Sequence, residues 1–164
     1  MSAANLRDAG RPAQEPRART LPAQRVVNQL MRGLLRTPLL CRLVGKRLMT
    51  VYVVGRKSGR RYTVPVAYTR SNGTLLIGTS FAWARNLRTG APVDIRLAGT
   101  RRPADVQVYT DERGVVEHFA AMARDNHAFA KFNQIGFDDN GAPSKEDLHL
   151  AWAAGARAIR LTPR

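Results

Sequence analysis

Residues 51–68 consist of two apolar runs around a short basic turn. They read Val51-Tyr52-Val53-Val54, Gly55-Arg56-Lys57-Ser58-Gly59-Arg60-Arg61 and Tyr62-Thr63-Val64-Pro65-Val66-Ala67-Tyr68. The β-branched and aromatic runs predict two strands, and the two glycines predict a tight turn between them. Glycine permits positive φ angles and lets another group approach the main chain closely. The turn's N–H groups, its serine and its four cations could therefore surround an anion such as phosphate. The alternative is a solvated hairpin tip in a chain that is basic throughout.

The charge of the chain is high and unevenly placed. Its 164 residues carry a formal net charge of +15, and this length suits a single domain with a core of its own. Residues 1–62 hold 14 Lys and Arg against 2 Asp and Glu, a net +12, whereas residues 63–164 hold 13 against 10, a net +3. This excess predicts an anionic partner: a phosphorylated cofactor, an anionic lipid surface or nucleic acid.

The first part of the chain predicts a tail followed by helices. Residues 1–22 are rich in Ala, Arg and Pro and have no hydrophobic period, which predicts a disordered basic tail. Residues 23–36 show a helical apolar stripe with arginines beside it. This helix either packs on the domain core or lies on an anionic membrane surface. The single cysteine, Cys41, excludes an internal disulfide and is typical of a reducing cytoplasm. No apolar run is long enough to cross a bilayer.

From residue 50 the apolar period changes to two, which predicts short strands at 51–54, 62–68, 74–79, 93–97, 104–108 and 157–162. Pro65 cannot donate to a ladder, so its strand is expected at an edge or a bulge. Asn72-Gly73 predicts a hairpin, and residues 80–89 predict one or two helical turns. Asp111 predicts the N-cap of a helix, residues 126–137 a second helix, and residues 138–147 a polar loop. About six mainly antiparallel strands with flanking helices predict an α+β fold, a small closed sheet without exposed edges.

The sequence offers few protein groups for difficult chemistry. The three histidines, His118, His127 and His149, lack metal-ligand spacing, and no dinucleotide, phosphate-loop or nucleophile-elbow pattern is present. A candidate anion site without catalytic side chains is typical of an enzyme whose reactive atoms belong to a bound cofactor. We therefore predict no catalytic residue and no metal.

A second polar and aromatic cluster begins where the third predicted strand ends. It reads Thr79-Ser80-Phe81-Ala82-Trp83-Ala84-Arg85-Asn86-Leu87-Arg88. Trp83 could cover a flat ring system while neighbouring donors hold its carbonyls or a phosphate. The alternative is that Trp83 and Leu87 plug one end of the barrel while the arginines face water.

Taken together, Gly55-Arg56-Lys57-Ser58-Gly59, Pro65, the Asn-Gly hairpin and Trp83-Ala84-Arg85-Asn86-Leu87-Arg88 resemble the deazaflavin-dependent nitroreductase family. The resemblance runs from about Arg25 to the C-terminus. It implies a split β-barrel related to that of flavin-dependent pyridoxamine phosphate oxidases. It also implies hydride transfer from the reduced 5-deazaflavin coenzyme F420 to a quinone, a nitro compound or another activated acceptor.

The resemblance also implies a set of cofactor-binding residues. Arg56, Lys57 and Ser58 would hold the phosphate and anionic tail, with Arg60 and Arg61 replacing an arginine that many members carry at the position of Tyr62. The deazaflavin would be lined by Tyr62, Thr63, Val64, Pro65, Val66 and Ala67 and by Gly78, Thr79, Ser80 and Phe81. Ala82, Trp83, Ala84, Arg85 and Asn86 would close over it.

The acceptor pocket is expected to differ from that of the nitroimidazole-reducing relatives. Those relatives carry tyrosines in the segment that matches residues 126–137, where this chain has His127, Phe129 and Phe132. The two phenylalanines are equally compatible with a core role.

Two rival functions stay open. One is a flavin mononucleotide- or haem-binding protein on the same barrel. The other is a non-enzymatic basic protein on a membrane or on nucleic acid, the latter disfavoured because no aromatic residues are interleaved in the basic run. A homodimer is compatible with the sequence.

Overall fold

The computed structural model describes residues 47–164. The predictions for the tail at 1–22, for the N-terminal helices with their membrane contact, and for Cys41 lie outside these residues.

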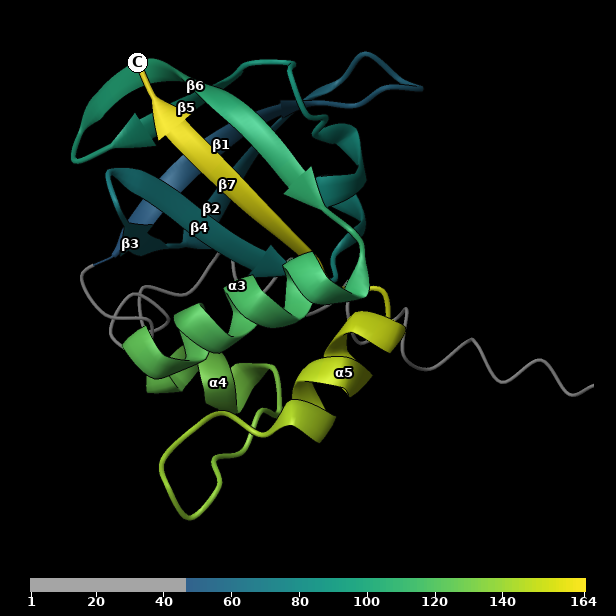
Figure 1. The fold of residues 1–164 in the computed structure, drawn as a ribbon. Helices are drawn as coiled ribbons and strands as arrows, with labels where there is room; N and C mark the ends of the chain where they lie inside the picture. The colour runs from purple at the N-terminus through teal and green to yellow at the C-terminus, as the bar shows by residue number, and fades with distance from the viewer. Residues whose placement is uncertain (1–46) are drawn as a thin grey trace, which may run out of the picture. The chain divides into compact units, whose positions relative to one another are not determined.

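The described chain forms one antiparallel sheet that curls into a half-barrel (Figure 1). Its strands are β1 (Leu48–Val54), β2 (Arg61–Ala67), β3 (Thr69–Ser71), β4 (Thr74–Thr79), β5 (Val93–Leu97), β6 (Thr100–Tyr109) and β7 (Arg157–Pro163). Their order is β2-β1-β5-β6-β7-β4-β3. The two outermost strands, β2 and β3, are separated by Tyr68 alone, so the sheet must curl, although no ladder joins these two strands in the described residues. The predicted α+β class with a split β-barrel is confirmed, with seven strands where about six were expected.

The turns obey the backbone rules that the sequence suggested. In the β1–β2 pair Val54 faces Arg61. Between β3 and β4 both turn residues have positive φ, 47° at Asn72 and 76° at Gly73, the geometry that suits a two-residue hairpin. Pro65 lies in β2, which among the described strands pairs with β1 alone, so it occupies the edge strand that was expected for it.

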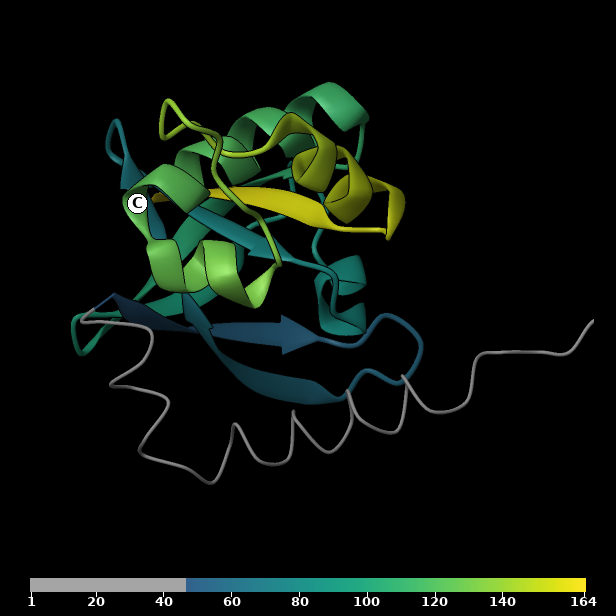
Figure 2. The same ribbon diagram turned by 90° about the horizontal axis from the view of Figure 1, so that it is seen from below.

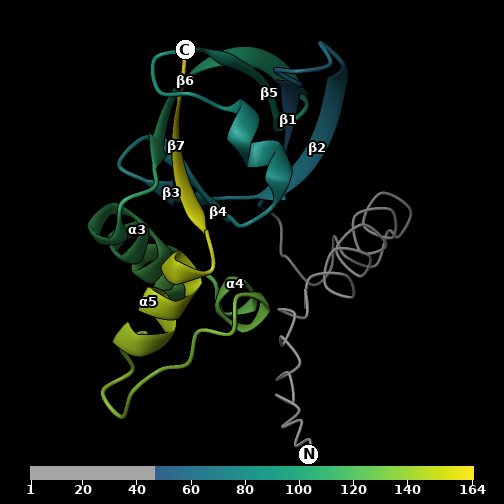
Figure 3. The same ribbon diagram turned by 90° about the vertical axis from the view of Figure 1, so that its right-hand side faces the viewer.

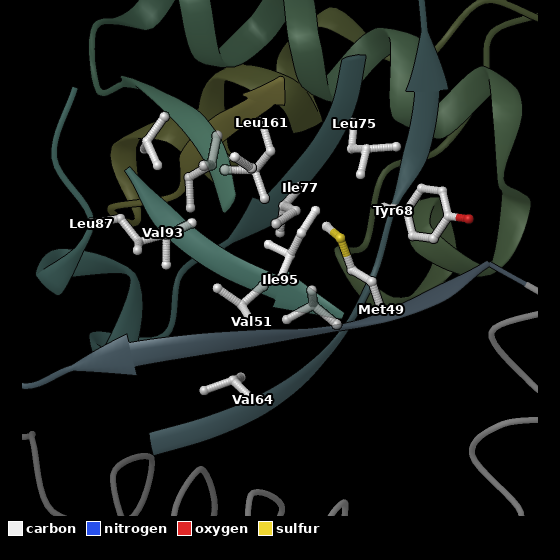
Figure 4. Packing of buried hydrophobic residues seen from close by; sticks show 14 of the residues in the cluster. Met49, Val51, Val64, Tyr68, Leu75, Ile77, Leu87, Val93, Ile95 and Leu161 are labelled. Carbon is white, nitrogen blue, oxygen red and sulfur yellow. The ribbon is translucent and has the colours of Figure 1, made fainter. Parts of the chain in front are cut away.

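Alternation along the strands fills the barrel interior (Figure 4). In β1 the buried residues are Met49, Val51 and Val53. They belong to the same apolar cluster as Ile95 from β5. Strand β4 differs because Leu75, Leu76 and Ile77 are all buried. Leu75 and Ile77 belong to the barrel interior, whereas Leu76 belongs to a second apolar cluster outside it.

That second cluster lies under the helices α3 (Glu112–Asp125), α4 (His127–Phe132) and α5 (Lys145–Ala153). Helix α3 contacts β4 and β7, and Figure 2 shows α3 and α5 over β7, on the far side of the barrel from the β1–β2 pair. Asp111 caps α3 as predicted, by accepting a hydrogen bond of 2.8 Å from the Gly114 amide.

Two helix predictions need correction. The helix expected over 126–137 ends at Phe132, and Gln134 has a φ of 58°, which a continuing helix cannot accommodate. The polar loop expected over 138–147 ends earlier, because α5 begins at Lys145. Ser144 caps α5 by accepting a hydrogen bond of 3.2 Å from the Asp147 amide. This serine was the feature of the sequence that could have indicated the start of the helix.

The helical turns expected within 80–89 are present as a short 3-10 helix, η1 (Ala82–Asn86). Figure 3 shows η1 lying across one end of the barrel. Within residues 47–164, no helix combines the length and apolar character needed to span a bilayer.

Candidate functional site

The loop between β1 and β2 depends on both of its glycines. The Gly55 amide donates to the Arg60 carbonyl and the Gly59 amide donates to the Gly55 carbonyl, each at 2.8 Å. Gly59 has a φ of 62°, which favours glycine. A Cβ on Gly55 would lie 2.8 Å from Ser58 Oγ and 3.0 Å from Tyr62 Cε2. The tight turn predicted from the sequence is therefore confirmed.

The polar groups of this loop divide into an inner and an outer set. Ser58 Oγ turns inward and accepts a hydrogen bond of 3.3 Å from the Arg60 amide, with Tyr62 OH 3.5 Å away. Arg56 also uses its amide within the protein. Within the described chain, the amides of Lys57 and Ser58 have no acceptor. Two successive N–H groups are thus left for an external anion, and the loop side chains are exposed around them.

Helix η1 is joined to this loop through Asn86. The Arg56 amide donates to Asn86 Oδ1 at 3.1 Å, and Asn86 Nδ2 donates to the Trp83 carbonyl at 3.0 Å. Figure 2 shows η1 beside the loop. The two segments that the sequence singled out, thirty residues apart, therefore lie side by side.

Helix η1 also plugs the barrel. Ala84 and Leu87 are buried in the barrel core, and Trp83 packs against it. The side chain of Trp83 is thus largely used for packing, as the plug alternative expected, while Ala82 and Arg85 are exposed.

The charge of the described chain is concentrated around these elements. Residues 47–93 hold eight cations and no acid, whereas residues 94–164 hold ten of each, so the net +8 of the described chain comes from the first part. Six of the eight cations belong to the loop, the start of β2 and the η1 region: Arg56, Lys57, Arg60, Arg61, Arg85 and Arg88. None of the six forms a salt bridge within the described residues. Uncompensated cations beside free amides suit a phosphate or a carboxylate ligand.

A groove of about 560 Å³ runs next to the loop on the outer face of the sheet. Its cationic walls come from Arg61, Arg88, Arg101 and Arg164. Arg101 bonds to Asp94 at 2.6 Å, and its guanidinium lies 4.4 Å from the ring centre of Tyr52. Sequence reasoning missed the last two arginines and Tyr52. The signal available for Tyr52 was its position between the buried Val51 and Val53, which places it on the outer face.

The residues of β2 that were predicted to line the coenzyme ring fall on two faces. Val64 and Val66 are buried in the barrel core, so their side chains are not available to a ligand outside the barrel. Thr63, Pro65 and Ala67 alternate with them and face outward. Tyr62 shares the inward register but lies at the end of the strand, 43% exposed.

The predicted residues 78–81 divide in the same way. Gly78 packs under Phe129, and Thr79 is buried, with its hydroxyl accepting a hydrogen bond of 3.1 Å from the Phe81 amide. Ser80 is exposed. Phe81 faces Phe132 with ring centroids 6.4 Å apart.

The three residues predicted for the acceptor pocket have different surroundings. Phe129 makes an edge-to-face contact with the buried Phe119 at 5.2 Å, so it has a core role. His127 stacks on Phe137 at 4.9 Å. Phe132 is 60% exposed and contacts Phe81. Two of the three contact residues that were predicted to line the coenzyme: Phe129 packs on Gly78 from the core side, and the exposed Phe132 faces Phe81.

A second and larger hollow, of about 790 Å³, lies between α3 and residues 137–148. It is lined by Val116, Ala120 and Leu148 at its apolar part, with Arg124 and Glu146 among its polar residues. No residue predicted for the cofactor site lines it.

Comparison with known proteins gives limited likenesses. No model of a known protein family and no curated protein matches the chain. Among solved structures, a conserved hypothetical protein from Mycobacterium tuberculosis has a TM-score of 0.45 and 13% identity, over 74% of this chain and 76% of its own.

Two further solved structures are similar to the chain. One, described as a putative 5-nitroimidazole antibiotic resistance protein from Bacteroides thetaiotaomicron, has a TM-score of 0.45 and 11% identity, over 83% of this chain and 79% of its own. A protein from Mesorhizobium loti described as FAD-binding has a TM-score of 0.39 and 17% identity, over 78% and 90% of the two chains. At these values the assignment of the fold rests on the strand order, not on the likenesses.

Proposed function

We propose that the protein is an oxidoreductase that transfers a hydride from reduced coenzyme F420 to an electron-poor acceptor such as a quinone, a nitro compound or an activated alkene. One observation carries the proposal. The loop 55–60, whose Lys57 and Ser58 amides and whose cations have no partner among residues 47–164, is hydrogen-bonded to η1 through Arg56 and Asn86 at a rim of the barrel. The family resemblance of these same two segments names the coenzyme.

The residues fit an anionic cofactor. The amides of Lys57 and Ser58 and the side chains of Arg56 and Lys57 would hold its phosphate, because charge-assisted hydrogen bonds from N–H groups are the strong ones. Arg60 and Arg61 would face its anionic tail. The side chain of Ser58 accepts a hydrogen bond within the loop, so Ser58 would contribute its amide and could add the donor of its hydroxyl group.

The ring would lie against the outward side of β2 and beside Phe81. Thr63, Pro65 and Ala67 face outward there, and Val64 and Val66 could contribute only backbone groups. When bound, the reduced coenzyme supplies the hydride. The protein's part is to hold the ring and the acceptor in contact, which can account for most of the acceleration.

The exposed ring of Phe132, in contact with Phe81, would form a wall of the acceptor site. A flat aromatic wall suits a flat acceptor such as a quinone. His127, at the start of α4, would lie beside Phe137.

The experiment uses purified full-length protein with reduced coenzyme F420 and menadione. We expect the absorbance of the oxidised coenzyme to appear at a rate proportional to the protein concentration. Equilibrium dialysis against flavin mononucleotide tests the rival cofactor on the same barrel, and we expect weaker retention of it than of the deazaflavin. Tight retention of flavin mononucleotide or haem without deazaflavin binding would overturn the proposal.

Deleting residues 1–22 distinguishes the enzyme from a basic docking protein. Turnover is expected to persist in the truncated chain, because the proposed site lies within residues 47–164. The contact of residues 23–36 with a membrane remains a prediction. The formation of a homodimer is also a prediction.

A further inference from the structure

We infer that Asn86 is a positioning residue. It holds the β1–β2 loop in the shape that presents its two free amides, and it does not itself bind the coenzyme. The inference rests on the proposed function for its consequence, but its structural part can be measured without any ligand.

The first step is that both polar atoms of the Asn86 side chain are engaged within the protein. Oδ1 accepts from the Arg56 amide at 3.1 Å and Nδ2 donates to the Trp83 carbonyl at 3.0 Å. An amide group that bonds two backbone segments at once fixes their separation. The side chain is half-buried, which limits its approach to a ligand.

The second step is that one of these segments is fixed in the core. Ala84 is fully buried and Leu87 is buried, both in the barrel cluster. Asn86 lies between them in the chain and is therefore anchored through η1. Its hydrogen bond extends this anchorage to Arg56, whose own side chain is exposed.

The third step concerns which loop amides remain free. Those of Gly55, Gly59 and Arg60 are bonded inside the loop, and that of Arg56 is bonded to Asn86. Lys57 and Ser58 follow directly, so a displacement of Arg56 would move both of their N–H groups. Without Asn86, the Arg56 amide would also compete for the anion. The loop would then no longer hold the amides of Lys57 and Ser58 in a single arrangement.

The test compares Asn86→Ala with Asn86→Asp, which keeps an oxygen acceptor at the same position. The matched control is Thr89→Val, because Thr89 Oγ1 accepts from the Val108 amide at 3.0 Å and so braces a backbone amide elsewhere. Amide hydrogen exchange is measured by NMR on the full chain without coenzyme. The dissociation constant and kcat are then measured with reduced coenzyme F420 and menadione.

In Asn86→Ala we expect exchange at the Arg56 amide to accelerate roughly fivefold or more, and the coenzyme dissociation constant to rise roughly tenfold, since a lost hydrogen bond is expected to have effects of this order. The kcat at saturating coenzyme should change much less, because Asn86 does not touch the reacting atoms. Asn86→Asp should keep the Arg56 amide protected. Thr89→Val should expose the Val108 amide and leave the Arg56 amide and the dissociation constant unchanged.

Unchanged exchange at Arg56 in Asn86→Ala would overturn the inference. An unchanged dissociation constant despite faster exchange would also overturn it, and so would a fall in kcat as large as the loss of binding, since that indicates direct contact with the ring. If the wild-type protein binds no coenzyme while the exchange results are as expected, the positioning role of Asn86 is supported and the proposed function fails.

Discussion

A Cβ atom on Gly78 would lie 2.6 Å from Cζ of Phe129, closer than two carbon atoms can approach. Gly78 in β4 therefore makes room for an aromatic ring from α4. This contact joins the sheet to the helix that carries the predicted acceptor residues.

Substituting Gly78→Ala should destabilise the protein by about 1–3 kcal/mol, because the added methyl group overpacks a filled site. Chemical denaturation with a constant m-value measures the change. In a Phe129→Leu background the same substitution should cost less, since the opposing ring is smaller. An equal cost in both backgrounds would show that the contact with Phe129 is not its cause.

Truncation of the two phenylalanines of α4 should affect different properties, stability for Phe129 and acceptor binding for Phe132. Phe129→Ala should lower the free energy of unfolding by about 3 kcal/mol, because its ring packs on the buried Phe119. Phe132 is 60% exposed, so Phe132→Ala should leave stability nearly unchanged and raise the KM for menadione. Denaturation curves and steady-state kinetics on the same preparations provide the measurement. A large loss of stability in Phe132→Ala, with KM unaltered, would assign that ring to packing.

The ion pair between Asp105 and Arg164 gives a pH-dependent contribution to stability. The hydrogen bond from Arg164 lowers the pKa of the Asp105 carboxyl below its ordinary value of 3.8, and Asp105 in turn raises the pKa of Arg164. Because the folded pKa is the lower one, the contribution is present above the unfolded pKa and is lost as the pH falls through the folded one.

Asp105→Asn should therefore be slightly less stable than wild type at neutral pH and equal to it well below pH 3.8. The effect should be small because both groups are exposed. Urea denaturation across this range measures it, with Arg164→Gln closing a double-mutant cycle. A stability difference that persists in acid would point to a cause other than the ion pair.

Local rules were sufficient to predict most of the sheet. Alternation and turn residues located the β1–β2 pair, and Asn72 and Gly73 located the next hairpin. The curl of the sheet also followed, but the predicted full closure did not, because β2 and β3 remain edge strands in the described residues. The position of β7 between β6 and β4 was not predictable in this way, since it depends on pairing across some fifty residues of helix and loop.

The site was predictable in its segments but less so in its individual residues. The composition of 55–61 and 82–86 indicated both segments, and the Arg56–Asn86 hydrogen bond joins them. Which side chains face a ligand depends on strand register and on helix packing. Sequence spacing could not show that Val64 faces the core, that Gly78 lies under Phe129, or that Arg164 lines the same groove as Arg61.

The most direct test of the account is a titration of reduced coenzyme F420 into the wild-type protein and into the Arg56→Ala/Lys57→Ala variant. Each charge-assisted hydrogen bond that is lost should cost about 1.5–3 kcal/mol, so the double variant should bind more than tenfold more weakly. The control is Arg70→Ala/Arg113→Ala, which removes the same charge from β3 and α3 and should bind like wild type. Equal affinity of the Arg56→Ala/Lys57→Ala variant and the wild type would contradict the assignment of the loop as the anion site.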